Sequence, residues 1–142
     1  MISPNYLKEG ATVAIVSTAR KISKKELIPA ITILKKWGLK VVLGKSIEAE
    51  EHQFAGNDKL RTSDFQAMLD PPGIDAVWCA RGGYGTVRII DQLDFSNFKK
   101  HPKWIIGFSD VTVLHSHIHQ LGIETLHAQM PVSIETKSKA TI

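Results

Sequence analysis

Residues 104–115, WIIGFSDVTVLH, place a serine and an acid where an apolar run gives way to a helical pattern. A serine on a tight turn between a strand and a helix projects its hydroxyl above the sheet, beside the free N–H groups and positive dipole end of the helix. Ser109 at such a turn could act as a nucleophile. Nucleophile elbows usually have a glycine two residues after the serine, where this chain has Val111. The alternative is that Ser109 or Asp110 only caps the helix.

A glycine cluster follows another apolar run, in the sequence CARGGYG at residues 79–85. Glycine lets backbone N–H groups approach a bound group closely and permits left-handed turns. One N–H of this loop and the N–H after the serine could form an oxyanion hole, in which each donor contributes about 3 to 4 kcal/mol to transition-state stabilisation. A tight turn without a ligand and a phosphate-binding loop are the alternatives. The spacing matches neither the dinucleotide fingerprint nor a P-loop, so nucleotide binding has weak support.

The histidines raise the question of a metal site. His115 and His119 are one helical turn apart, but His117 points to the opposite side and no third ligand has a fixed spacing. We therefore predict no metal ion and interpret this segment as a solvated helix. His127 follows the last apolar run, and we interpret it as a hydrogen-bonded structural histidine.

Short apolar runs alternate with helical patterns, which is typical of a parallel sheet covered by helices. Strands are expected at residues 12–17, 40–44, 75–80, 103–107 and 123–127, and helices at residues 23–38, 57–70, 85–93, 94–101 and 111–121. The predicted fold class is α/β, an open doubly wound and mainly parallel sheet of the flavodoxin-like or Rossmann-like three-layer type. Ligands of such sheets bind outside the carboxyl ends of the strands. Residues 17–19, 81–85 and 109–110 fall at those ends.

The first expected helix has clear start and stop signals. Ser23 and Glu26 form a capping box, and Gly38 supplies a left-handed stop. Pro29 lies in the second turn, so either the helix is kinked or residues 23–28 form a separate turn. The expected apolar face consists of Leu27, Ile31, Leu34 and Trp37.

Composition sets limits on the class of protein. The chain has 142 residues, 43% hydrophobic and 23% charged, which indicates one globular domain. The net charge of +4 comes from scattered basic pairs without interleaved aromatic residues, so nucleic acid is not a predicted partner. Cys79 is the single cysteine and is expected in the core. We expect no membrane span, no leader sequence and a cytoplasmic location.

Three segments together resemble a known family: residues 54–95, GFSDVTVLH at residues 107–115, and LHAQMP at residues 126–131. They are similar to the N-terminal half of the serine LD-carboxypeptidases, the muramoyl-tetrapeptide carboxypeptidase family that also contains microcin immunity proteins. The resemblance implies an enzyme of cell-wall recycling that removes terminal D-alanine from murein tetrapeptides without a cofactor. It implies that Ser109 is the nucleophile and that the N–H groups of Gly83 and Asp110 form the oxyanion hole.

The same resemblance implies a glutamate and a histidine from a C-terminal domain, which this chain does not contain, and a homodimer for the full-length protein. Residues 1–132 are then the nucleophile-bearing domain and residues 133–142 the start of an interdomain linker. Because the histidine base is missing, we expect the chain to be inactive by itself.

Some residues at the expected rim differ from the family pattern, so the identity of the substrate is not determined by the resemblance. Ala128 and Gln129 stand where the family usually has Gly-Pro, so an immunity-type cleavage of an aminoacyl-nucleotide amide is one alternative. A non-catalytic anion-binding or nucleotide-binding module is another. Arg81 is our candidate for binding a substrate carboxylate, with Tyr84 as a further substrate-binding residue. The alternative for Arg81 is a salt bridge that stabilises the loop.

Overall fold

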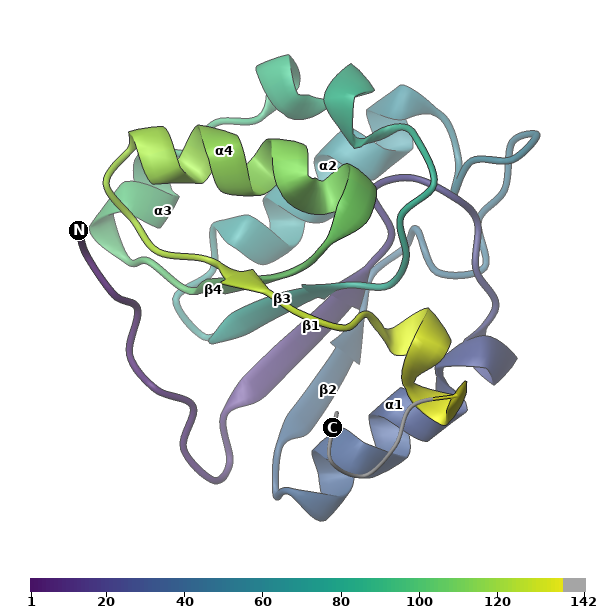
Figure 1. Cartoon of the computed structure of the whole chain (residues 1–142), viewed down its shortest axis with the longest axis horizontal. Helices are drawn as coiled ribbons and strands as arrows, with labels where there is room; N and C mark the ends of the chain where they lie inside the picture. Colours follow the sequence, from purple (N-terminus) through teal and green to yellow (C-terminus); the bar gives the residue numbers. More distant parts are fainter. Residues whose placement is uncertain (137–142) are drawn as a thin grey trace.

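A computed structural model of the chain describes residues 1–136 and shows a five-stranded parallel sheet between two helical layers (Figure 1). The strands are β1 (Thr12–Val16), β2 (Lys40–Leu43), β3 (Ala76–Cys79), β4 (Trp104–Gly107) and β5 (Leu126–His127). Their order is β2-β1-β3-β4-β5, and every pairing is parallel. This is the flavodoxin-like doubly wound order, so the predicted fold class is confirmed.

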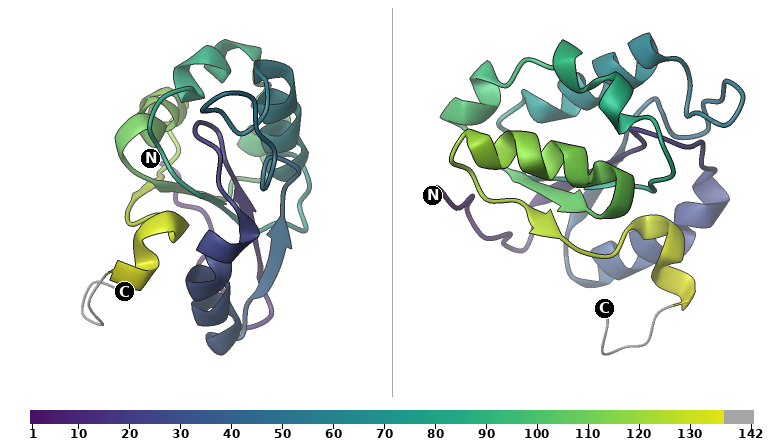
Figure 2. Two further views of the ribbon diagram at one scale, coloured as in Figure 1. Left: turned by 90° about the vertical axis from the view of Figure 1, so that its right-hand side faces the viewer. Right: turned by 45° about the horizontal axis from the view of Figure 1, so that its top comes forward.

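Helices cover both faces of the sheet. The α-helices are α1 (Lys24–Lys36), α2 (Asp58–Leu69), α3 (Ser96–Lys100) and α4 (Thr112–Gln120). The 3-10 helices are η1 (Thr86–Arg88), η2 (Ile90–Gln92), η3 (Ser109–Val111) and η4 (Pro131–Thr136). α1 and η4 lie on one face, whereas α2, α3 and α4 lie on the other (Figures 1 and 2). Residues 137–142 lie outside the described part, so the predicted linker is described only as far as Thr136, at the end of η4.

The hydrophobic core has two parts, one on each side of the sheet. On the α1 side, Leu27 and Leu34 pack with Val13, Ile15 and other buried residues of β1 and β3. On the other side the helices α2, α3 and α4 each contribute buried apolar residues, and these pack on residues of β3 and β4. Those helical residues are Phe65, Leu69, Phe98, Leu114 and Ile118. The central strands β1 and β3 are buried on both faces, as expected of a parallel sheet, whereas the edge strands β2 and β5 are not.

α1 follows its sequence signals closely at both ends. The Ser23 side chain accepts from the Glu26 N–H while the Glu26 carboxylate accepts from the Ser23 N–H, which confirms the capping box. The helix runs unbroken through Pro29, so the separate-turn alternative is wrong. Gly38 has φ +81°, as its role as a left-handed stop requires.

Two details of the predicted helices are wrong. Trp37 was expected on the buried face of α1, but it is the C-cap residue and is 54% exposed, and Ala30 is buried instead. Residues 85–93 were expected to form one helix and form η1 and η2 instead. Gly85 begins this segment at φ +138°, which is not a helical conformation, and the chain turns tightly here.

The start of α2 agrees with the sequence, whereas α3 begins two residues later than expected, with Phe95 as its N-cap residue. Asn57 rather than Asp58 caps α2, because its side chain accepts from the Leu60 N–H at 2.8 Å. The Asp94 carboxylate accepts from the Ser96 N–H at 2.9 Å and so stabilises the start of α3. Within the described residues, no helix has the length and apolar character needed to cross a membrane.

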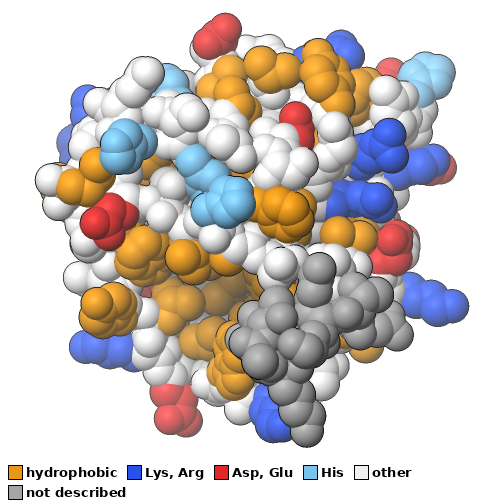
Figure 3. Space-filling view, viewed as in Figure 1, with side chains coloured by type: hydrophobic (Ala, Val, Ile, Leu, Met, Phe, Trp, Pro, Cys, Tyr) orange, Lys and Arg blue, Asp and Glu red, His pale blue; other side chains and the backbone are white. Residues whose placement is uncertain are grey.

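The face seen in Figure 3 has an apolar hollow below β5. Its volume is about 430 Å³, and its apolar walls include Trp37, Trp78, Ile106 and Leu126. The hollow contains no serine, cysteine or histidine among its lining residues. The serine of the expected strand–helix turn therefore lies elsewhere, at the carboxyl ends of the strands.

Candidate active site

The carboxyl ends of β1, β3 and β4 lie side by side, because these strands are neighbours in a parallel sheet. β1 connects through α1 to β2 on one side and lies beside β3 on the other, so the strand order reverses here. This switch point is where doubly wound sheets bind ligands. A pocket of about 200 Å³ opens there, and it brings together loop residues that are far apart in the sequence. They are Arg20, Arg81, Gly82, Gly83, Phe108, Ser109, Met130 and Val132.

Ser109 occupies a strained turn between β4 and η3. Its φ of +61° lies in the left-handed region, which costs a non-glycine residue about 1 to 2 kcal/mol. The residue is exposed, and its hydroxyl has no hydrogen-bond partner within residues 1–136. Strain of this kind is concentrated at functional sites, where the surrounding structure enforces it.

The alternative that Ser109 or Asp110 merely caps a helix is not supported by the contacts. Neither η3 nor α4 has a side-chain cap hydrogen bond. The Asp110 carboxylate instead accepts from the N–H of Thr86, directly after the glycine-rich segment, at 3.0 Å. The serine hydroxyl is thus left free, and the acid connects two loops.

Close packing under the turn explains why a glycine precedes it rather than follows it. A Cβ added at Gly107 would lie 3.1 Å from Cγ1 of Val111 and 3.4 Å from Cβ of Cys79. Val111, which stands where elbows usually have their second glycine, is fully buried in the core. The room for the tight turn is therefore made by Gly107, and Val111 anchors η3 from below.

The glycine-rich segment lies against the amide nitrogen that follows the serine. A Cβ added at Gly82 would lie 3.5 Å from the backbone nitrogen of Asp110. The Asp110 N–H is in the first turn of η3, where N–H groups lack intrahelical partners. Gly83 has φ +112°, and its N–H has no hydrogen-bond partner within the described part of the chain. Two free backbone donors therefore lie close to the serine.

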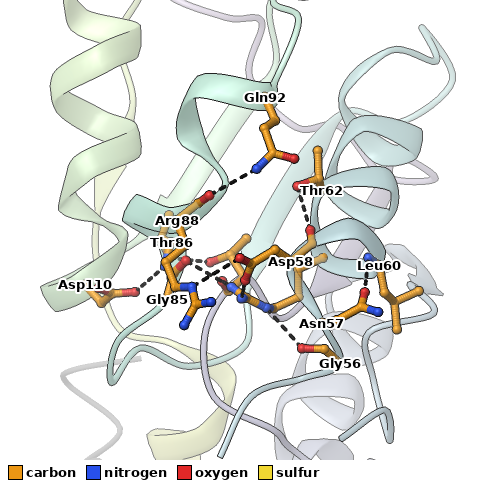
Figure 4. A network of polar contacts seen from close by, with 12 residues as sticks. Gly56, Asn57, Asp58, Leu60, Thr62, Gly85, Thr86, Arg88, Gln92 and Asp110 are labelled. Carbon is orange, nitrogen blue, oxygen red and sulfur yellow. Dashed lines mark hydrogen bonds and ion pairs between the residues drawn. The ribbon is translucent and has the colours of Figure 1, made fainter. Parts of the chain in front are cut away.

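A network of polar contacts fixes these loops relative to one another (Figure 4). The Thr86 hydroxyl is 2.7 Å from the hydroxyl of Thr18, which lies in the loop after β1. Since Thr86 also donates its N–H to Asp110, one residue joins the loops after β1, β3 and β4.

Arg61 is the centre of this network and is 1% exposed. Its Nη1 donates to the carbonyls of Thr18 at 2.8 Å and Gly85 at 2.9 Å, and its Nε to that of Gly56 at 3.3 Å. Its Nη2 forms an ion pair with the Asp58 carboxylate. Burial lowers the pKa of Arg61, while Asp58 acts in the opposite direction. No sequence signal singles out Arg61, because an arginine in the first turn of a helix is usually solvated.

The two predicted substrate-binding residues differ in position. Arg81 lines the pocket, but its Nη1 is 3.8 Å from the Glu26 carboxylate and 3.4 Å from the Lys21 carbonyl that it donates to. The salt-bridge alternative therefore has a structural basis. Tyr84 is 49% exposed, packs near Phe54 and does not line the pocket.

The histidines behave differently from the prediction. His115 is not solvated: its ring nitrogens contact the Thr125 hydroxyl at 2.6 Å and the Gly107 carbonyl at 2.8 Å. Burial lowers its pKa. His127 is exposed and without a hydrogen bond among the described residues, so its structural interpretation is wrong; its ring lies 5.8 Å from that of Phe108. No group of three possible metal ligands occurs within residues 1–136.

Cys79 lies in the core, as predicted. The side chain is fully buried at the end of β3, and burial raises the pKa of the thiol to about 12. A thiol with this pKa is protonated and unreactive near neutral pH. The exposed Ser109 is the better candidate for a nucleophile.

Fold and site together define a three-layer α/β protein with a strained serine at the end of β4 and a glycine-rich loop at the end of β3. Residues 13–128 match the family model described as the LD-carboxypeptidase N-terminal domain. The chain belongs to this family, as its motifs predicted.

Two curated relatives show how much of a whole protein this chain represents. The chain is 41% identical over 128 residues to the probable murein peptide carboxypeptidase of Bacillus subtilis, which covers 89% of this chain and 40% of that protein. It is 33% identical over 123 residues to the murein tetrapeptide carboxypeptidase of Pseudomonas aeruginosa, which covers 86% of this chain and 40% of that protein. The chain therefore spans about 40% of the length of these relatives.

Solved structures show the same arrangement. The muramoyltetrapeptide carboxypeptidase of Oxalobacter formigenes has a TM-score of 0.77 and 27% identity, covering 85% of this chain and 40% of that one. A microcin C7 self-immunity protein in complex with aspartyl sulfamoyl adenosine has a TM-score of 0.88, covering 96% of this chain and 42% of that one. At 24% identity, the second likeness shows the fold alone.

Proposed function

We propose that the chain is the nucleophile-bearing domain of a serine peptidase that removes terminal D-alanine from murein tetrapeptides. The curated relatives, which are named as murein peptide carboxypeptidases, support this substrate class. The observation that carries the proposal is the exposed hydroxyl of Ser109, held at φ +61° without a partner among the described residues.

In the proposed mechanism, Oγ of Ser109 attacks the carbonyl carbon of the scissile amide. The hydroxyl proton passes to a base, and negative charge develops on the carbonyl oxygen. In this proposal the N–H groups of Asp110 and Gly83 donate to that oxygen. The C–N bond then breaks, D-alanine leaves with a proton returned by the base, and water hydrolyses the serine ester.

The base must come from outside the described residues in this proposal. No histidine or carboxylate within residues 1–136 contacts the Ser109 hydroxyl. The family resemblance places a glutamate and a histidine in a C-terminal domain, beyond the 40% of the relatives that this chain spans. Because triad residues act as a unit, the 142-residue chain alone should be slower than the complete enzyme by a factor on the order of 10⁶.

Other parts of the proposal rest on the same resemblance. They are a role in cell-wall recycling, a cytoplasmic location, a homodimer for the full-length protein, and the division into a domain of residues 1–132 and a linker from residue 133. Arg81 and Tyr84 remain substrate-binding candidates, although Tyr84 lies outside the pocket.

The test compares two substrates with the full-length product of the gene. One is a murein tetrapeptide ending in D-alanine, and the other is an aminoacyl sulfamoyl nucleotide, the ligand class named for the microcin immunity structure. The proposal predicts D-alanine release and little cleavage of the nucleotide. Exclusive cleavage of the nucleotide would support the immunity-type alternative, and cleavage of neither would favour a non-catalytic binding module.

A further inference from the structure

Two guanidinium groups share the pocket with the serine. Arg20 follows β1 and Arg81 follows β3, and both line the same pocket of about 200 Å³ beside Ser109. No acidic residue lines this pocket among the described residues. The pocket therefore carries positive charge next to the proposed nucleophile, which favours a substrate with an anionic group.

The two arginines differ in what their guanidinium groups contact. That of Arg81 is near Glu26 and donates to a backbone carbonyl. The Arg20 guanidinium makes no hydrogen bond or ion pair within residues 1–136. All of its side-chain donors are therefore available to a ligand.

The backbone of Arg20 is nevertheless held in place. The Ser17 hydroxyl donates to the Arg20 carbonyl at 2.5 Å, and the Arg20 N–H donates to the Gly82 carbonyl at 3.4 Å. The Arg20 backbone is thus attached to the glycine-rich segment, so the side chain starts from a fixed position.

The Arg20 side chain also lies directly over Gly83. Its Nε is 2.7 Å from the place where a Cβ on Gly83 would be, and its aliphatic carbons are also close. Any side chain at residue 83 would displace Arg20 from this position. The absence of a side chain at Gly83 therefore leaves room for the Arg20 side chain beside the proposed oxyanion hole.

We propose that Arg20 binds the terminal carboxylate of the substrate and thereby selects peptides that end in a free acid. This proposal rests on the proposed function, because it assigns the leaving amino acid to the side of Ser109 on which Arg20 lies. A guanidinium matches a carboxylate with two parallel hydrogen bonds, whereas a carboxamide offers neither the charge nor two acceptors. Arg81, engaged with Glu26, has the lesser role.

The binding test uses the 142-residue chain and needs no catalysis. Backbone NMR signals are followed while N-acetyl-D-alanine or N-acetyl-D-alaninamide is added. The proposal predicts shifts at residues 20 and 83 with the acid and not with the amide. Arg20→Gln should weaken binding of the acid on the order of 10- to 100-fold, whereas Arg81→Gln should have a smaller effect and Lys24→Gln, on the exposed side of α1, none.

An equal response to the acid and the amide, no response to either, or unchanged binding in Arg20→Gln would each overturn the assignment. So would a larger loss in Arg81→Gln than in Arg20→Gln.

Kinetics of the full-length gene product provide the second readout. Arg20→Gln should raise KM for a D-alanine-terminated peptide by a similar factor with little change in kcat, and Arg20→Lys should restore part of the loss. An unchanged KM in Arg20→Gln would contradict the assignment. Failure of the hydrolase proposal is distinguishable, because the acid-selective NMR shifts would then persist in a protein that releases no D-alanine.

Discussion

The two sides of the strand-end rim differ in how their polar groups are used. On the anchored side, which comprises Arg61, Thr18, Thr86 and the Asp110 carboxylate, every group named has a partner. On the open side, the Ser109 hydroxyl, the Gly83 N–H and the Arg20 guanidinium have none within the described residues. Arg61, Thr18 and Thr86 of the anchored side are buried, whereas the residues of the open side line the pocket.

This difference indicates that the anchored side has a structural role and the open side a binding role. Buried apolar residues, among them Ile22, Ile90 and Val111, hold the segments after β1, β3 and β4 against the core. The buried hydrogen bonds of the anchored side fix the loops, so that the groups of the open side can remain unpaired without moving. A site whose donors are held in advance needs no reorganisation when charge develops on the substrate.

Removing Arg61 should have the largest effect on stability. Arg61→Met would leave the carbonyls of Thr18 and Gly85 unpaired and the Asp58 carboxylate without its buried partner. We expect a loss of about 3 to 5 kcal/mol in the free energy of unfolding, measured by urea denaturation. Arg88→Met is the matched control, since Arg88 bonds the same carboxylate at 3.1 Å but is 45% exposed; it should cost about 1 kcal/mol or less. Equal losses in the two variants would show that the buried network does not anchor the loops.

Breaking the hydrogen bond that joins the loops after β3 and β4 should have an intermediate effect. Asp110→Ala removes the acceptor of the Thr86 N–H and should cost about 1 to 3 kcal/mol, because that N–H lies in a partly buried site. Faster hydrogen exchange at Thr86, measured by NMR, should accompany this loss. Unchanged exchange would mean that the carboxylate does not connect the loops.

Relieving the strain at the serine should stabilise the protein. Ser109→Gly should raise the free energy of unfolding by about 1 kcal/mol, because glycine adopts φ +61° readily and the hydroxyl has no contact to lose. Ser116→Gly, an exposed serine inside α4, should lower it by about 0.5 to 1 kcal/mol. If both variants lost stability, the serine would not be strained.

The smallest expected effect is on the pH dependence of stability and concerns His115, whose ring contacts the Gly107 carbonyl before the turn. Burial lowers the pKa of His115 below its ordinary value of 6.5, so in the folded protein its neutral form is favoured. As pH falls below about 6.5, the unfolded chain takes up a proton before the folded one, and stability should fall. His115→Gln should make this part of the pH dependence smaller, as measured by urea midpoints between pH 5 and 7.5. An identical pH profile in the variant would assign the effect to other groups.

The fold, and the proximity of Ser109 to the glycine-rich loop, could be predicted from the sequence. Alternating apolar and helical patterns define a parallel sheet, and strand-end motifs of neighbouring strands must then lie at one edge. The positions of the arginines could not be found in this way. Arg61 is buried because the carbonyls of residues 18, 56 and 85 surround its guanidinium. In the sequence Arg20 is part of one of several basic pairs, and only its contact with Gly83 in the fold distinguishes it. Such contacts depend on how loops that are distant in sequence pack, which local patterns do not encode.

The most direct test of the central proposal is D-alanine release from a murein tetrapeptide by the full-length gene product and its Ser109→Ala and Ser116→Ala variants. Our account predicts that Ser109→Ala loses on the order of 10⁴-fold or more in kcat while Ser116→Ala keeps the original rate, since only residue 109 supplies the attacking oxygen. Release by Ser109→Ala at the rate of the unmodified protein would contradict the proposal that Ser109 is the nucleophile.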